Sequence, residues 1–328
     1  MSEQFKEQGG AATMDPSRLM RWLTSRVMTR LSRPAAVAAR HRKAEQARVK
    51  AGTAHRVEYF HQVDEGYSFL AAQMLERLAA RYDIELHCHL VRGQEGKNAP
   101  EPELLAQLAR VDSHRIAPGY GLTFPDHPEA RTPDLVQTAT ERLAAQSNAD
   151  FHRVAASVSE ALWRDDAGSL AQLAAEFGAA STEAAAAAVE AGTAKRRELK
   201  HYSGAMFYYG AEWYWGVDRL YHLEQRLAAL GADTQPGAPL IAPRPDVDLA
   251  GHRDTGQYTL ELYASLRSPY TAIIFDRAVA FAKAAGVTLS LRPVLPMVMR
   301  GVPATREKGM YIFMDAAREA HAAGVAYG

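Results

Sequence analysis

Hydrophobic positions change their spacing twice within residues 260–295, and the pattern predicts a strand, a helix and a second strand. A short apolar run ends shortly before Pro269, and helices tolerate proline in their first turn because no intrahelical acceptor waits there. Apolar side chains then recur every three or four residues up to Gly286, a typical C-terminal stop. Val287, Leu289 and Leu291 alternate as in a strand. We therefore expect a βαβ unit.

The same order of patterns occurs earlier, in residues 57–91. The two stretches align without gaps at an offset of 203 residues, which places Glu58 on Glu261 and Tyr67 on Tyr270. Identities are few, so the comparison rests on the spacing of the apolar positions. Two copies of one supersecondary unit predict two domains of one fold, although the period is too long for a solenoid.

A basic stretch precedes the first copy. Residues 1–14 are polar and glycine-rich, which predicts disorder, and residues 16–50 are helix-forming with one apolar stripe. One interpretation is an amphipathic helix on an anionic membrane surface. The other, which we favour, is an arm whose stripe packs on the domain behind it, because any docked helix shows such a stripe. The stripe consists of Leu19, Leu23, Val27 and Leu31, with Trp22 beside it and Arg18, Arg21, Arg26, Arg30 and Arg33 around it.

The middle of the chain changes from helical to strand-like spacing. Residues 100–200 are expected to be helical, with interruptions at 119–133 and near Gly168 and Gly178. Two aromatic runs, residues 206–209 and 212–215, are joined by a glycine-containing turn and predict a β-hairpin. Asp218 then suits the N-cap of a helix over residues 219–230.

These patterns predict a division of the chain into four parts. Proline, glycine and aspartate are concentrated in residues 232–256, which is typical of a linker. The linker separates a first domain, with its helical insertion at about 100–200, from the start of a second domain of the same pattern. The predicted parts are a basic helical arm (1–52), the first domain (53–231), the linker (232–256) and the N-terminal half of the second domain (257–328).

Composition limits the class of protein. The chain has 328 residues, 47% of them hydrophobic, and a formal charge of zero, which is typical of a soluble globular protein and not of one that coats nucleic acid. No apolar run is long enough to span a bilayer, and the N-terminus lacks the apolar core of a secretory signal. The single cysteine, Cys88, excludes an internal disulfide and a CxxC pair. We expect a cytoplasmic protein in a reducing compartment.

Short motifs relate the chain to a known superfamily. SPYT, at residues 268–271, resembles the Cys-Pro-Tyr-Cys turn of DsbA proteins with hydroxyls in place of both thiols. That replacement is typical of 2-hydroxychromene-2-carboxylate isomerases and kappa-class glutathione transferases. GAEWYWGVDRL (210–220) resembles their GELFWGxDRL signature, YGLTFP (120–125) their YGLPFP, RPVL (292–295) the end of their second strand, and residues 308–318 the start of their helical insertion. Together these matches cover about residues 55–328, apart from the linker.

The resemblance implies an α/β protein: a thioredoxin-like fold with helical insertion, in tandem, with an incomplete second copy. It also implies a site that binds glutathione. Ser268 would donate a hydrogen bond to the glutathione thiolate, which would then attack an electron-poor substrate carbon. Capping of a helix explains Ser268 and Asp218 equally well. The residues implied are Ser268 and Tyr270 for catalysis, and Asp218, Arg219, Pro269 and Trp215 for cofactor binding, with Asp218 on the glutathione amino group.

The sequence also departs from the family pattern. In the first copy Glu65 occupies the thiol-binding position, where its carboxylate would repel a thiolate. The cis-proline expected before the hairpin is absent, since Ala205 and Met206 stand there. The second copy has the serine, but the sequence ends at Gly328 without a hairpin. Because half of a thioredoxin fold leaves a sheet edge uncovered, we expect a truncated chain.

Other polar candidates are weaker. His87 and His89 lie on one face of a strand with Cys88 on the other, so a metal site is not expected. His61 and Asp64 flank the first turn and could form an acid–base pair, although a solvated loop explains them as well. An aromatic cluster suits either a substrate cleft or hairpin packing; it consists of Phe207, Tyr208, Tyr209, Trp213, Tyr214 and Trp215.

Two functions from different classes therefore stand. The first is a glutathione-dependent isomerase or transferase for a small electrophilic or aromatic substrate. The second is a non-catalytic binding or assembly protein that keeps the thioredoxin fold and pairs its two domains. For either function, a homodimer is a further expectation. SPYT and WGVDRL favour the enzyme, whereas Glu65 and the missing proline favour the binding protein. A dithiol oxidoreductase is excluded by the single cysteine.

Overall fold

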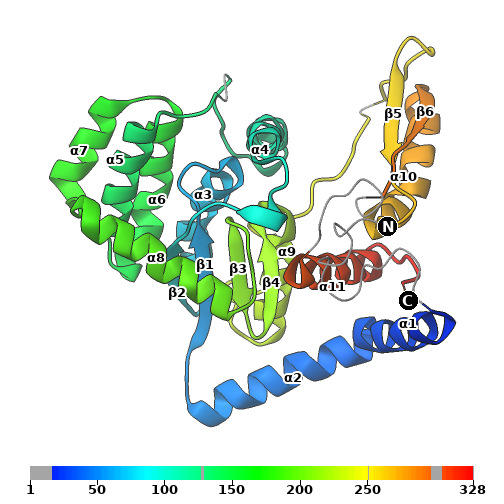
Figure 1. Cartoon of the computed structure of the whole chain (residues 1–328), viewed down its shortest axis with the longest axis horizontal. Coiled ribbons are helices and arrows are strands. Elements are labelled where there is room, and N and C mark those ends of the chain that lie inside the picture. Colours follow the sequence, from blue (N-terminus) through cyan, green and yellow to red (C-terminus); the bar gives the residue numbers. More distant parts are fainter. Residues whose placement is uncertain (1–16, 127–128, 250, 297–304, 328) are drawn as a thin grey trace. The chain divides into compact units, whose positions relative to one another are not determined.

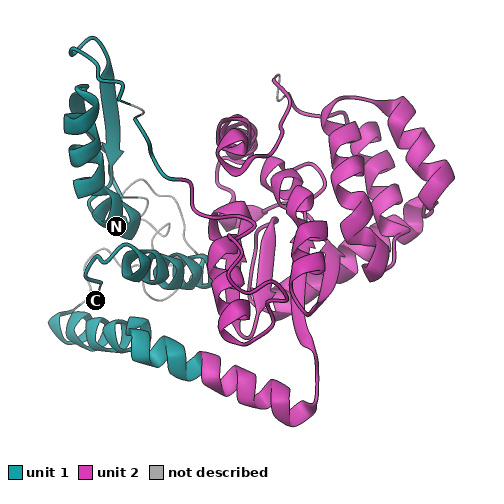
Figure 2. Cartoon of the chain, turned by 180° about the vertical axis from the view of Figure 1, so that it is seen from behind, with its two compact units in different colours: residues 1–40, 246–328 teal, residues 41–245 magenta. Residues whose placement is uncertain are grey.

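The structure is a computed structural model, and it describes residues 17–126, 129–249, 251–296 and 305–327 (Figure 1). The disorder predicted for residues 1–14 lies outside these residues. The chain divides into two compact units, which Figure 2 distinguishes by colour. Unit 1 comprises residues 1–40 and 246–328, and unit 2 comprises residues 41–245. Each unit contains one of the two βαβ stretches. Within the described residues, no helix has both the length and the apolar character needed to cross a membrane.

Unit 2 is built on a four-stranded sheet. Strands β1 and β2 are parallel and connected through α3, whereas β3 pairs antiparallel with both β1 and β4, giving the order β2-β1-β3-β4. This is the strand order of a thioredoxin-like fold, as the sequence predicted. The elements are β1 (His55–His61), α3 (Gly66–Arg81), β2 (Ile84–Leu90), β3 (Met206–Tyr209) and β4 (Glu212–Trp215).

The predicted helical insertion lies between β2 and β3. Helix α3 packs against α4, α6 and α9, while α8 lies against β2. The approach of α8 is close, because a Cβ at Gly192 would collide with the carbonyl oxygen of Leu90. The helices are α4 (Pro102–Ile116), α5 (Pro133–Ala144), α6 (Asn148–Trp163), α7 (Ala167–Phe177), α8 (Thr182–Glu198) and, after the hairpin, α9 (Gly216–Ala229), with short 3-10 turns η2 (Gly96–Asn98) and η3 (Ala117–Tyr120).

The core of unit 2 joins the sheet to these helices. Strand β1 is buried at every position except Arg56, including the polar residues His55, Glu58 and His61. Phe207 of the hairpin packs against Tyr59 of β1, with ring centroids 4.7 Å apart. Half of the predicted aromatic cluster is therefore core: Phe207, Tyr209 and Tyr214 are buried, whereas Tyr208, Trp213 and Trp215 are half-buried.

Unit 1 contains the second βαβ stretch. It consists of β5 (Thr259–Ala264), α10 (Pro269–Ala285) and β6 (Thr288–Pro293), followed by α11 (Arg306–Ala322), and its two strands pair in parallel. Helices α10 and α11 pack around a small core of Ile273, Ala316 and Ala320. The predicted strands and helices of this stretch are confirmed to within about two residues.

The basic N-terminal stretch forms two helices instead of one. Helix α1 (Arg18–Ser32) is followed by Arg33, whose non-helical backbone is what a following proline requires. Helix α2 (Pro34–Ala51) begins at that proline. Helix α1 contacts α11, and its buried position is Ser32, with Met28 and Thr29 half-buried. The apolar stripe faces away from this contact and is exposed. The stripe is therefore not packed within unit 1, contrary to the favoured interpretation of a docked arm.

The two βαβ stretches share one strand register. His55 pairs with Ile84 across β1 and β2, and Thr259 pairs with Thr288 across β5 and β6, so the partners are equally far apart in sequence. The hydrogen bond that follows β2, from the Val91 N–H to the His61 carbonyl, recurs at the offset of 203 residues. It runs from Val294 to Ala264, and both bonds are 2.9 Å long.

Side-chain contacts repeat at the same offset. Tyr67 donates a 2.8 Å hydrogen bond to Asp112, and Tyr270 donates a bond of the same length to Asp315. A second repeated contact joins an acid of the first strand to a basic residue of the second: Glu58 to His89, and Glu261 to Arg292, each at 2.6 Å. The correspondence therefore extends from the strands into α4 and α11.

Candidate functional site

The N-terminus of α3 is closed by buried side chains. Glu65 is the N-cap residue, but its carboxylate makes no capping hydrogen bond to the helix, and only 9% of the residue is exposed. Ser68 Oγ donates to Glu65 Oε2 at 2.7 Å. The same hydroxyl accepts the backbone N–H groups of Gln62 and Ala205, each at 3.1 Å. One serine thus joins the end of β1, the first turn of α3 and the segment before β3.

The backbone of the segment before β3 also covers the N-terminus of α3. A Cβ at Gly204 would lie 2.6 Å from Glu65 Oε2, so Gly204 is pressed directly against the carboxyl group. Ala205, which stands where the sequence lacks the family's proline, is fully buried with a φ of +51°. Such a left-handed conformation disfavours a side chain and persists only where surrounding contacts hold it. Here the Ala205 carbonyl accepts the Gly216 N–H at 2.7 Å.

The closed site holds groups with shifted pKa values. Burial raises the pKa of Glu65 to about 7, although the hydrogen bond from Ser68 and the charge of Arg196 act in the opposite direction. Burial lowers the pKa of Arg196 to about 10. Burial, followed by the charge of Arg196, lowers the pKa of His201 to about 3. The site therefore contains a carboxyl group that titrates near neutrality and an imidazole that stays neutral there.

His61 is a second neutral imidazole in this region. It is fully buried, and burial lowers its pKa to about 3. The Tyr59 hydroxyl donates to the Ser68 carbonyl at 3.1 Å and lies 3.0 Å from His61 Nδ1. Since the hydroxyl hydrogen is already used, His61 is assigned the tautomer with the proton on Nδ1, which donates to the Tyr59 oxygen. Asp64 is exposed and accepts instead from Gln62. The suggested His61–Asp64 acid–base pair is therefore not formed.

A second cluster in unit 2 gathers the family-like motifs. Tyr120 of YGLTFP donates a 3.0 Å hydrogen bond to Asp218 of WGVDRL. The ring of Trp215 meets the ring of Tyr67 edge-on at 5.9 Å. Arg219 Nη1 lies 4.0 Å from Asp218 Oδ2. The structure thus brings Trp215, Asp218 and Arg219 close to the start of α3.

The predicted N-cap role of Asp218 is wrong. Helix α9 begins at Gly216 with Trp215 as its N-cap residue, which places Asp218 inside the first turn. An acid there still stabilises the helix through its dipole. About half of the Asp218 side chain is exposed, so its outer face is open to solvent.

The serine site of unit 1 is more open. Ser268 is the N-cap residue of α10, but its side chain makes no capping hydrogen bond and is half-buried. Pro269 occupies the first helical position, and the Tyr270 hydroxyl bonds to Asp315. The capping explanation for the Ser268 hydroxyl is thus not borne out. The predicted site residues fall into two groups, with Ser268, Pro269 and Tyr270 in unit 1 and Trp215, Asp218 and Arg219 in unit 2.

The histidines of β2 serve as partners for acids. His89 lies 2.6 Å from Glu58, and His87 lies 3.5 Å from Glu85. Cys88 between them is half-buried, and burial raises the pKa of its thiol. Over the described part of the chain, no group of three or more His, Cys, Asp or Glu side chains is arranged to hold a metal ion.

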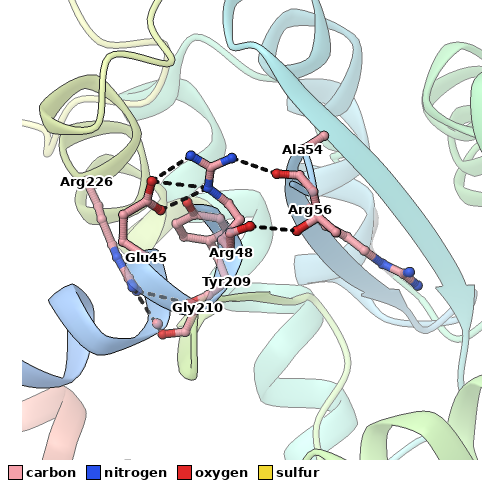
Figure 3. A pocket seen from close by; sticks show the side chains of 9 residues that line it. Glu45, Arg48, Ala54, Arg56, Tyr209, Gly210 and Arg226 are labelled. Carbon is pink, nitrogen blue, oxygen red and sulfur yellow. Dashed lines mark hydrogen bonds and ion pairs between the residues drawn. The ribbon is translucent and has the colours of Figure 1, made fainter. Parts of the chain in front are cut away.

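A pocket of about 140 Å³ lies where the end of α2 meets the β3–β4 turn (Figure 3). Its guanidinium groups are engaged by the protein. Arg48 binds Glu45 at 2.6 Å and the Thr53 carbonyl, while Arg226 binds the carbonyls of Tyr209 and Gly210 at 2.9 and 3.0 Å. Arg48 therefore fixes the end of α2 to the loop that follows it, and Arg226 fixes α9 to the β3–β4 turn, so both guanidinium groups have structural roles.

Sequence reasoning missed Ser68, Arg196 and His201. Each is an ordinary residue type in its segment, and only the fold brings α3, α8 and the segment before β3 together. It also missed Asp112 and Asp315, although the 203-residue offset that aligns the tyrosines aligns these acids too.

Comparisons with known proteins return structural likeness only. No family model matches the chain, and no curated protein matches it by sequence. One similar solved structure is a 2-hydroxychromene-2-carboxylate isomerase, with 21% identity over 54% of this chain and 96% of the other and a TM-score of 0.40. Another is a probable DsbA oxidoreductase from Streptomyces coelicolor, with 14% identity over 57% and 94% and a TM-score of 0.39. The assignment of a thioredoxin-like fold rests on the strand order of unit 2.

Proposed function

We propose that this protein is a glutathione-dependent isomerase or transferase for a small electrophilic or aromatic substrate, and that Ser268 is the residue that binds the glutathione thiolate. The observation that carries the proposal is the state of the Ser268 hydroxyl. It lies at the start of α10, half-buried, without the capping bond that serine usually makes in this position. The hydroxyl can therefore donate to a ligand.

The start of α10 favours a thiolate over a thiol. The first backbone N–H groups of a helix have no intrahelical acceptor, and the helix dipole places partial positive charge at the same end. Both effects lower the pKa of a nearby thiol. A hydroxyl that donates to the sulfur adds to this stabilisation, and it leaves glutathione as a nucleophile near neutral pH.

Unit 2 is proposed to serve as a scaffold and not as a second thiolate site. Glu65 and the main chain of Gly204 already fill the start of α3. A thiolate placed there would meet a carboxyl group in a desolvated environment, which raises the energy of both anions. The family resemblance implies that Asp218 binds the glutathione amino group and that Trp215 contributes to cofactor binding.

We also propose that the two βαβ stretches belong to tandem copies of one thioredoxin-like domain. The shared strand register and the repeated Tyr–Asp bond support this proposal. A compensating exchange supports it as well. Gly66 packs so close to Ser113 that a Cβ would lie 2.6 Å from the hydroxyl, and the equivalent positions in unit 1 are Pro269 and the smaller Ala316. A cytoplasmic location is part of the proposal, since glutathione stays reduced there.

Glutathione-dependent conversion of an electrophilic substrate tests the proposed activity directly. The full chain is assayed with glutathione and two electrophiles, chlorodinitrobenzene and a 2-hydroxychromene-2-carboxylate. We expect Ser268→Ala to lower kcat/KM by about a hundredfold, as the loss of one donor to a reacting anion does, and to move the pH profile to higher pH. Ser265→Ala is the matched control, because Ser265 is also half-buried and its carbonyl, which the substitution keeps, accepts the Ser268 N–H.

A non-catalytic binding or assembly protein is the second candidate. The N-terminus of α3 favours this candidate, because the Glu65 and Ser68 side chains occupy the position where glutathione would bind in the first copy. This candidate predicts neither turnover nor glutathione binding by the full chain. Turnover that depends on glutathione but is equal in wild type and Ser268→Ala would reject the role of Ser268 while keeping an enzyme.

A further inference from the structure

The apolar stripe of α1 is the largest exposed group of hydrophobic side chains on one described helix. Two of its aliphatic residues, Leu19 and Val27, are 65% and 55% exposed. Single exposed hydrophobic residues are normal, but a contiguous exposed stripe marks an interaction surface. The exposed residues are Leu19, Met20, Trp22, Leu23, Val27 and Leu31.

The side of α1 that packs against unit 1 is different from the side that carries the stripe. Ser32 is the buried residue of α1, and Met28 and Thr29 on the same side are half-buried. The helix therefore contacts its own unit through a small, mainly polar side and leaves the apolar side to solvent. Its start is fixed locally, because Ser17 Oγ accepts the Met20 N–H at 3.3 Å. Arg40 donates to the Leu31 carbonyl at 3.0 Å and holds its end.

The charge around the stripe has one sign. Between Pro16 and Ala44 the sequence contains eight arginines and lysines and no acidic residue, although the whole chain is neutral. Arg26 lies over the Trp22 ring at 4.5 Å, so a cation and an interfacial aromatic residue stand together at the stripe's edge. This part of the chain is complementary to a negatively charged surface.

We propose that α1 binds the surface of an anionic lipid bilayer. Its aliphatic stripe enters the boundary between headgroups and acyl chains, and its arginines contact lipid phosphates and carboxylates. At 15 residues the helix is about 22 Å long, too short to span a bilayer but suited to lie in its plane. Trp22 occupies the interface, where tryptophan is enriched.

Two other occupants fit the surface less well. A nucleic acid would use the arginines but gain little from exposed leucine and valine side chains, since its outer surface is a phosphate backbone. A second copy of the chain would bury the stripe but bring two sets of arginines together, and like charges at an interface are unfavourable.

Cosedimentation with vesicles tests the proposal with the full-length chain. Vesicles of phosphatidylcholine alone are compared with vesicles that also contain phosphatidylserine, at low and high salt. We expect binding to the anionic vesicles only, weakened by salt. Leu23→Asp/Val27→Asp should reduce the partition coefficient by at least about tenfold, because charged groups enter the interface poorly. Leu104→Asp/Leu108→Asp on α4 is the matched control, because these leucines are 61% and 60% exposed.

Each alternative has its own outcome. Failure of the wild-type chain to bind anionic vesicles overturns the proposal. Binding that survives Leu23→Asp/Val27→Asp but is lost in Arg26→Gln/Arg30→Gln overturns the inserted stripe and leaves charge attraction alone. A dimer in light scattering that Leu23→Asp dissociates, or equal competition by duplex DNA, also contradicts it. Circular dichroism of the variants verifies that the helix remains.

Discussion

Ser68 donates a 2.7 Å hydrogen bond to Glu65 in the first turn of α3, and both side chains are buried. The contact fills the place where a thioredoxin-like protein presents its reactive residue. Burial raises the pKa of Glu65 to about 7, so its carboxyl group gains or loses a proton near neutrality. Unit 2 therefore holds a polar network at the position where unit 1 holds an open serine.

Removal of the Ser68 hydroxyl should destabilise unit 2 strongly. Ser68→Ala leaves the N–H groups of Gln62 and Ala205 buried without this acceptor, and we expect a loss of about 3 kcal/mol in the free energy of unfolding. Ser113→Ala is the control. Ser113 is also fully buried, but its hydroxyl has no hydrogen-bond partner among the described residues, so its removal should change stability by less than about 0.5 kcal/mol. Urea denaturation measures both. Equal losses would contradict the network.

Glu65→Gln should alter how stability depends on pH. The folded-state pKa, about 7, lies above the ordinary value of 4.5, so the folded protein holds a proton that the unfolded chain has released. The wild-type chain should therefore lose stability as pH rises from 4.5 to 7, by about 3 kcal/mol relative to Glu65→Gln. Parallel urea titrations across this range measure the difference. A difference that stays constant with pH would refute the raised pKa.

His61 should act in the opposite direction at low pH. Burial lowers the pKa of His61 from 6.5 to about 3, so between these values the unfolded chain binds a proton that the folded protein excludes. Stability should fall as pH decreases, with a contribution of about 1.4 kcal/mol per pH unit. His61→Leu should flatten the acid side of the profile, whereas His252→Leu, at an exposed histidine, should not. Identical acid slopes in all three proteins would count against a buried neutral imidazole.

The repeated Tyr–Asp bonds should stabilise separate regions. Tyr270→Phe removes the bond between α10 and α11, and Tyr67→Phe removes the bond between α3 and α4, each at a cost of about 1 kcal/mol. Hydrogen exchange should show faster opening of α10 in the first variant and of α3 in the second. Asp315→Ala should be more severe, about 3 kcal/mol, because Arg318 also contacts this carboxylate at 2.6 Å. Equal effects on both helices in each variant would contradict the assignment.

Local patterns predicted most of the elements. The hairpin of residues 206–215 and both βαβ stretches follow from apolar spacing, and the strand order agrees with the fold that they suggested. Helix α9 was misplaced at its start, because Asp218 is a good N-cap residue by type but lies within the helix. Capping preference is a local property, and here the hairpin determines where the helix begins.

Long-range contacts were harder to foresee. Ser68 is one of many serines in the sequence, and only the return of the chain at Ala205 gives it a second backbone donor besides the nearby Gln62. The burial that shifts the pKa of Glu65 also comes from segments far apart along the chain. The stripe of α1 was recognised, but its environment was not, because periodicity identifies an apolar face without specifying what covers it.

Glutathione binding by calorimetry tests the central claim most directly, namely that the open serine of unit 1 holds the thiolate. The account predicts binding by the wild-type chain, loss of at least about tenfold in affinity in Ser268→Ala, and little change in Ser265→Ala or Glu65→Gln. Binding should also release a proton near neutral pH, visible as a dependence of the heat on the buffer. Absence of binding to the wild-type chain, or equal binding by Ser268→Ala, would contradict the account.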